Sequence, residues 1–261
     1  MLAHFLLVKT ILKSFLGAIV FYTIIPLPLS WGLEIGRIAR WTPIIGLIIG
    51  GILNLTDFLL IQLNMPILTR TGLILALWVA LTGALHLDGV MDTADGLGVT
   101  DSDRRLEVMQ DSRVGAFGAI AAMFLLLLKF TSLVELGSAR YLGLILAPIW
   151  GRWGQVWAIA LYPYLKPTGK GAFHKENIQL PQDLLIGLFC LLSIITLIMI
   201  FFEPQQWWCG IAMILSGLVV TFATNFWFYR QLGGFTGDSY GAVVEWIETL
   251  FLCCLIIINN R

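Results

Sequence analysis

Acidic residues are concentrated in one stretch of an otherwise apolar chain: seven of the 16 lie between His86 and Arg113. Asp88, Asp92 and Asp95 are spaced by four and three residues, so a helix would present them on one face. Carboxylates this close repel one another and need a cation. Oxygen ligands without His or Cys suit Mg²⁺ or Mn²⁺ rather than zinc, and Mg²⁺ is commonly shared between carboxylates and substrate phosphates. The spacing predicts a site for one of these cations and for phosphate chemistry; the alternative is a solvated acidic loop.

The residues after this stripe add candidates for the same chemistry. Gly96 and Gly98 are expected to end the helix and to let the backbone approach a ligand closely. Asp111 would join the metal site if the chain doubled back. The planar guanidinium of Arg113 suits phosphate oxygens, which it can hold with two parallel hydrogen bonds. We therefore assign Asp111 and Arg113 to the catalytic group.

A second acidic segment, "GGFTGDSYGAVVEWIE", runs from Gly233 to Glu248. A helix beginning near Asp238 would place Asp238 and Glu245 on one face, with Asp238 as a further metal ligand. Glu245 would then lie inside a membrane span, where a carboxylate is costly and usually functional, so we assign it to substrate binding. The alternatives are an ordinary helix cap for Asp238 and pairing of both glutamates with Lys129 or Arg152.

The remaining polar candidates are weaker. His86 ends an apolar segment beside the acids and is assigned to substrate binding; a histidine satisfied within the bundle is the alternative. The segment "LKPTGKGAFHKEN" mixes lysines with glycines, and Lys170 and Lys175 are predicted to bind a phosphate or nucleotide. An ordinary basic loop on the cytoplasmic side explains them equally well.

The elements that must position these residues are membrane helices. The chain is 58% hydrophobic and 12% charged, with a mean hydropathy of +0.87, whereas soluble domains carry about 25% charged residues. We predict an all-α integral membrane protein, a polytopic helical bundle forming one catalytic domain over 1–261. Strands are not expected, because open sheet edges are excluded from lipid. Spans of about 20 apolar residues fall at eight places: 5–25, 42–63, 67–87, 116–136, 141–162, 184–202, 207–229 and 242–258.

The distribution of Lys and Arg between the loops predicts the orientation. Loops on one side hold nine of them and the other side holds five, and the richer side is expected to be cytoplasmic. The polar loops at 88–115, 164–183 and 230–241 all fall on that side and could build one site there. Both termini are expected on the opposite side. We expect no nucleic-acid partner, and the sequence leaves a homo-oligomer open.

Three motifs carry a resemblance to a known family. "TGALHLDGVMDTADGL", "LEVMQDSRVGAFGAIA" and "GGFTGDSYGAVVE" resemble the cobalamin synthase family, also called adenosylcobinamide-GDP ribazoletransferase. The early "FYTIIPLP" and "WTPIIGLIIG" are similar too, so the resemblance covers nearly the whole chain. Ile24 follows Thr23 where many members have Arg, so no role is carried over for that Arg. The resemblance implies a Mg²⁺-dependent enzyme of the cell inner membrane, in the last step of cobalamin nucleotide-loop assembly.

The resemblance also implies the reaction. Adenosylcobinamide-GDP would react with α-ribazole or its 5′-phosphate at the membrane face, and GMP would leave. Mg²⁺ held by the aspartates would clamp the diphosphate, with Asp95 as general base and Arg113 on phosphate oxygens.

Two other classes remain as alternatives. Asp92 to Gly96 reproduces the start of the CDP-alcohol phosphotransferase signature of lipid synthesis, but Val99 and Thr100 stand where Ala-Arg would follow. A cation-coupled transporter also places acids on glycine-interrupted helices, although at the bilayer midplane and between repeats. The acids here lie at span ends, and no internal repeat is evident.

Overall fold

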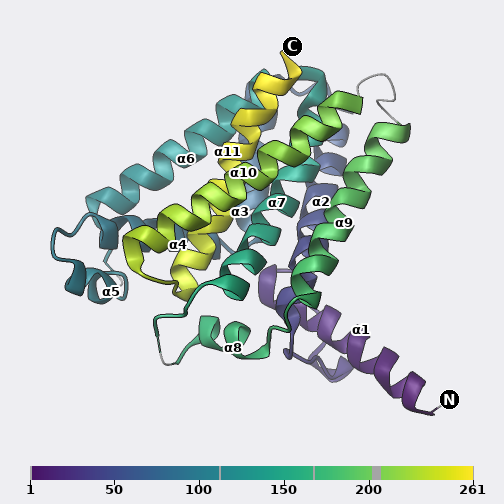
Figure 1. Ribbon diagram of the computed structural model, residues 1–261. Coiled ribbons are helices and arrows are strands. Elements are labelled where there is room, and N and C mark those ends of the chain that lie inside the picture. Colours follow the sequence, from purple (N-terminus) through teal and green to yellow (C-terminus); the bar gives the residue numbers. More distant parts are fainter. Residues whose placement is uncertain (1, 112, 167, 202–206, 261) are drawn as a thin grey trace.

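The protein is a helical bundle (Figure 1), described here from a computed structural model over residues 2–111, 113–166, 168–201 and 207–260. For residues 2–8, 29 and 170 only the backbone is described. The predicted all-α class is confirmed: within these ranges the β structure is a single bridge between Tyr164 and Phe235. The α-helices are α1 (Leu2–Tyr22), α2 (Thr42–Gln62), α3 (Ile67–Leu81), α4 (Leu85–Leu97), α5 (Arg105–Val108), α6 (Ala116–Glu135), α7 (Arg140–Leu161), α8 (Lys170–Asn177), α9 (Gln182–Phe201), α10 (Trp207–Leu232) and α11 (Gly237–Asn259), with 3-10 turns at Leu29–Trp31, Ile38–Trp41, Ser102–Arg104 and Gly137–Ala139.

Five of the described helices are long and apolar enough to cross a membrane, and a sixth span results if α3 and α4 are one broken span. The five are α2 with its preceding turn, α6, α9, α10 and α11. This count is lower than the eight predicted spans. One missing member is α7, which is buried along most of its length and includes Arg152 and Gln155. A helix surrounded by other helices does not need an apolar surface toward lipid, so hydropathy alone underestimates it.

The packing of α2 against α7 defines the centre of the bundle. Gly46 lies against the carbonyl of Pro148, and Gly50 lies against the carbonyl of Leu144. A Cβ atom at either glycine would come within 2.6–2.7 Å of those oxygens. Small residues at such contacts let two backbones approach closely, which is the usual way for helices to associate in lipid.

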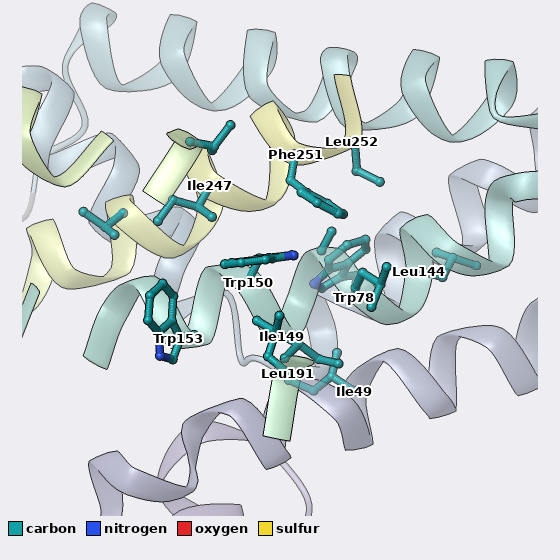
Figure 2. Close-up of a cluster of buried hydrophobic side chains, with 14 of the residues drawn as sticks. Ile49, Trp78, Leu144, Ile149, Trp150, Trp153, Leu191, Ile247, Phe251 and Leu252 are labelled. Carbon is teal, nitrogen blue, oxygen red and sulfur yellow. The ribbon is translucent and has the colours of Figure 1, made fainter. Parts of the chain in front are cut away.

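Large aromatic side chains fill the space between α7 and α11. Trp150 of α7 lies between Trp153 and Phe251, with ring centroids 5.7 and 6.1 Å away. Figure 2 shows this cluster together with Trp78 of α3 and the aliphatic side chains around it. The contact between Trp150 and Phe251 joins α7 to α11, two helices far apart in the sequence. It lies one turn from Glu248 and holds that part of α11 against α7.

The predicted span over 67–87 is wrong in one respect, because the helix stops at Leu81. Gly83 and Ala84 both have positive φ angles, 60° and 58°. The Ala84 N–H donates to the Val79 carbonyl and the Gly83 N–H to the Ala80 carbonyl, both at 2.9 Å, which is the Schellman pattern of a helix end. The chain then turns by 86° into α4, so the acidic stripe has a helix of its own.

The three polar loops meet at one end of the bundle, as predicted. Arg105 of the 88–115 loop donates to the Gln231 carbonyl of the 230–241 loop at 2.6 Å. A backbone hydrogen bond from Leu165 to Phe235 joins the 164–183 loop to the same 230–241 loop. In Figure 1 this end carries α5 and α8, and the C-terminus lies at the opposite end. The start of α1 lies toward the α8 end, so the expectation that both termini share the opposite side is not met.

This arrangement predicts which positions share a side of the membrane. Single cysteines at Ser102, Thr168 and Gln231, in a background without the four native cysteines, should all react with a membrane-impermeant thiol probe from one and the same side of the membrane. A cysteine at Ser138, which is exposed at the opposite end, should react only from the other side. Labelling of any of the first three from the same side as Ser138 would contradict a shared end.

Candidate functional site

The stripe of Asp88, Asp92 and Asp95 lies on one helix, α4, as the spacing predicted. α4 packs closely on the start of α11. Gly89 lies directly against the carbonyl of Asp238, where a Cβ atom would collide. The negative charges of Asp88, Asp238 and Asp95 all act on the Asp92 carboxylate. The fold therefore gathers the four predicted metal ligands into one electrostatic cluster.

Asp95 has a structural partner that the sequence analysis missed. Its two carboxylate oxygens accept the backbone N–H groups of Gly115 and Gly118, at 2.7 and 2.8 Å. These are amides at the start of α6, where the helix dipole favours a negative charge. Asp95 thus caps α6 from another helix. Its assignment as general base stays a prediction.

Asp238 lies in the first turn of α11, but it is not the cap of that helix. The cap is Thr236, whose hydroxyl accepts the Ser239 N–H at 3.3 Å while the Ser239 hydroxyl accepts the Thr236 N–H at 2.7 Å. This reciprocal pair is a capping box. The Thr236 hydroxyl also donates to the Asp238 carboxylate at 3.3 Å. Lys166 donates to it at 3.1 Å. The 163–166 segment therefore supplies a positive charge to the acidic cluster.

A cavity of about 220 Å³ opens beside Asp88 and Asp238. The end of α1, α4, α7, the start of α8 and the first turns of α11 surround it. Its wall is largely aromatic: Tyr164 stacks on Tyr240, and Tyr22 stacks on His174. The lining residues are Phe21, Tyr22, Leu85, His86, Asp88, Gln155, Tyr164, Lys166, Gly169, Gly171, His174, Gly237, Asp238, Tyr240 and Gly241.

Buried charges lie behind the cavity wall. Lys129 of α6 donates to Glu245 at 2.7 Å and to Glu248 at 2.5 Å, and its ammonium lies 4.5 Å from the centre of the Trp78 ring. The alternative that these glutamates pair with Lys129 is confirmed. Glu245 is not among the residues that line the cavity, and its predicted contact with substrate stays a prediction.

His86 connects this buried charge to the cavity. Its ring lines the cavity, is 3% exposed, and has Nε2 3.1 Å from a guanidinium nitrogen of Arg152. Arg152 is fully buried, lies over the Tyr22 ring, and is within electrostatic range of Glu245 and Glu248. Since a guanidinium only donates, the contact requires His86 Nε2 to accept and leaves the ring proton on Nδ1.

Other predicted residues lie away from the cavity. Arg113, whose side chain is 88% exposed, forms an ion pair with Asp111 at 2.6 Å, and these hydrogen bonds lower the pKa of Asp111 to about 2. Lys175 donates to the carbonyls of Ile159 and Ala160 at the end of α7, and burial lowers its pKa. Lys170 begins α8, and its side chain lies outside the described part. The roles assigned to these four residues stay predictions.

Most of the cavity wall is not predictable from the sequence. Tyr22, Gln155 and Tyr240 come from three helices, and nothing in their local sequence joins them. His174 and Lys166 belong to the segment "LKPTGKGAFHKEN", in which the sequence predicts a binding role only for Lys170 and Lys175. Burial lowers the pKa of His174 to about 4, so its ring is neutral at pH 7. The one available signal was Arg152, a charge inside an apolar segment, where an ionisable residue commonly marks function.

Fold and site together define a multi-pass helical membrane protein with an acid-lined cavity at one end of its bundle. The chain matches the family described as cobalamin-5-phosphate synthase over residues 14–256, and it belongs to that family. Relatives named adenosylcobinamide-GDP ribazoletransferase include one from Trichormus variabilis, 52% identical over 97% of this chain and 100% of its own length. Those from Thermosynechococcus vestitus and a Synechocystis species are 48% and 46% identical, over 94% and 93% of this chain and 96% and 94% of their own. No solved structure matches the chain.

The buried charges predict a specific pattern of stability. Lys129→Met leaves two buried glutamates facing Arg152 alone, and breaking a buried pair in this way costs about 3–5 kcal/mol. Adding Glu245→Gln restores the balance of one negative and one positive charge, so the double variant should recover most of that loss. The measurement is the thermal unfolding temperature of the detergent-purified proteins. Equal unfolding temperatures for the single and double variants would contradict this account of the cluster.

Proposed function

We propose that this protein transfers the adenosylcobinamide phosphate moiety of adenosylcobinamide-GDP to α-ribazole, or to α-ribazole 5′-phosphate, and releases GMP. The observation that carries the proposal is the cluster of α4 acids beside Asp238, at the mouth of a cavity. It occurs in a chain that aligns over 97% of its length with a relative of that name. This family membership favours the transferase over a lipid phosphotransferase or a transporter.

The reaction exchanges one substituent on phosphorus. A ribose hydroxyl oxygen of the acceptor bonds to the phosphorus that carries cobinamide, and the bond from this phosphorus to the bridging oxygen of the diphosphate breaks. GMP leaves with the bridging oxygen, and the hydroxyl proton passes to a carboxylate or to water. Such a transfer depends on alignment of the reactants and on neutralisation of phosphate charge.

The acidic residues fit a Mg²⁺ requirement. Asp88 and Asp92 form no ion pair or side-chain hydrogen bond within the described residues, and they offer hard oxygen ligands. No three acidic, His or Cys side chains converge at metal-binding distance in that part of the chain. Mg²⁺ does not require such a preformed cage, since one or two carboxylates, several waters and substrate phosphates commonly hold it. Bound there, it would neutralise diphosphate charge.

The residues of the chain have separate tasks in this scheme. Asp88 and Asp92, with Asp238, would hold Mg²⁺, and Lys166 beside Asp238 would supply a further positive charge for the diphosphate. Asp95 keeps the start of α6 against α4 and so fixes the position of the stripe. His86, held by Arg152, closes the inner wall.

We also propose that the site faces the cytoplasm from the cell inner membrane. The apolar helices support a multi-pass arrangement, and the excess of Lys and Arg in the loops at the site end supports the orientation. A nucleotide-activated donor and a phosphorylated acceptor are water-soluble at their charged ends, so a site at the membrane face rather than at the midplane gives them access.

The acids are tested by Asp88→Asn and Asp92→Asn. Each change keeps the size of the side chain and removes one charge, so folding should be retained. GMP release should fall on the order of 100-fold or more, as when a group that stabilises transition-state charge is lost. The matched control is Asp101→Asn, since this exposed residue caps the Ser102–Arg104 turn and Asn also caps. Near-normal turnover of both variants at low Mg²⁺ would overturn the metal site.

Asp95→Asn is expected to behave differently from its neighbours on the stripe. Asparagine keeps one acceptor, but its amide group would face the second backbone N–H of α6. The protein should therefore lose stability, by about 1–3 kcal/mol for a buried donor without a partner, as well as activity. Thermal unfolding separates the two effects: Asp95→Asn should unfold at a lower temperature than Asp92→Asn. An unchanged unfolding temperature would contradict the capping role.

A further inference from the structure

The inner part of the cavity has a chemistry different from its mouth. The charged side chains at its solvent-exposed edge are Asp88 in the first turn of α4, Lys166 after α7 and Asp238 in the first turn of α11. Asp88 is exposed, and the side chains of the Lys166–Asp238 pair are 23% and 30% exposed. Away from this edge the wall consists of Phe21 and the stacked pairs Tyr22–His174 and Tyr164–Tyr240. Aromatic rings of a ligand stack favourably on such surfaces.

Three buried side chains of the wall have polar atoms without a partner in the described part of the chain. They are His86 Nδ1, Gln155 Oε1 and the Tyr240 hydroxyl. Buried polar groups are nearly always hydrogen-bonded, and each one left unpaired is costly. A ligand with a few donors and acceptors among apolar ring atoms would relieve this cost. The wall thus favours a neutral, partly polar aromatic molecule.

The size of the cavity excludes the corrinoid part of the donor. Its volume of about 220 Å³ lies below the roughly 300 Å³ at which sites for drug-sized ligands begin. A corrinoid is far too large for it, whereas one aromatic ring system with part of its sugar is of suitable size. The phosphates of the donor would meet the acids at the mouth, where a cation is needed, and not the uncharged inner wall.

We propose that this cavity is the acceptor subsite, in which the aromatic base of α-ribazole lies against the Tyr22–His174 and Tyr164–Tyr240 walls. The ribose then points toward Asp88 and Asp238, where its hydroxyl meets the phosphorus of the donor. This assignment rests on the proposed function, since it takes the acceptor nucleoside from that reaction. It adds that acceptor and donor occupy opposite sides of the acidic cluster, with the corrinoid outside the bundle.

The test uses direct binding of α-ribazole to the purified, detergent-solubilised chain, measured by calorimetry without donor or metal. Gly237 lines the cavity, and a Cβ atom there would meet no heavy atom closer than 3.9 Å, so Gly237→Leu adds bulk at the cavity without a collision of its Cβ atom. Gln155→Leu removes one unpaired acceptor while keeping the wall closed. Gly51→Leu is the matched control, because Gly51 lies exposed on α2 with open space around its Cα.

Both cavity variants should bind α-ribazole about tenfold more weakly or worse, as for the loss of one good contact. Their KM for adenosylcobinamide-GDP and their affinity for GMP should match those of Gly51→Leu. Weaker binding of GMP or a raised KM for the donor, with α-ribazole binding unchanged, would assign the cavity to the nucleotide and overturn the proposal. Unchanged binding of both would also overturn it. Wild-type protein that binds α-ribazole but releases no GMP would refute the proposed function and leave this subsite standing.

Discussion

The close approach of α4 and α11 is the constraint on which the site depends. Gly89 lies against the Asp238 carbonyl, and a Cβ atom at Gly241 would lie 3.1 Å from the His86 Cα atom. At Gly89 only a residue without a side chain fits, and at Gly241 the contact is tight. Because the two backbones touch there, the acidic stripe of one helix faces the first turn of the other. The cation that these carboxylates need would be held between two helices and not on one.

Two further features keep α4 in that place. The Schellman end of α3 turns the chain by 86°, so α4 can leave the direction of the span that precedes it. At its other end, Asp95 binds the first amides of α6. A helix of 13 residues is marginal on its own, and it is held because both ends and one face are fixed by tertiary contacts.

Buried charges between the helices also help to position the site. Lys129, Glu245 and Glu248 form a buried cluster next to Arg152, and Arg152 in turn holds His86 at the cavity wall. A buried ion pair is weak support for stability, but it specifies geometry, since each charge must meet its partner. The cluster ties α6, α7 and α11 together directly behind the site. Through it, the packing of these helices determines the position of His86 in the cavity wall.

The sequence by itself determined the membrane class, the helical architecture, the common end of the three polar loops and the one-faced stripe of Asp88, Asp92 and Asp95. These depend on local hydropathy, loop charge and helical period, which short stretches of chain contain. Only the tertiary structure decided the break at Gly83 and Ala84, the burial of α7, the capping role of Asp95 and the wall built from Tyr22, Gln155 and Tyr240. The break is a local Schellman turn that hydropathy does not reveal. The other features arise from contacts between helices distant in sequence, and a period of 3.6 residues describes one helix without its neighbours.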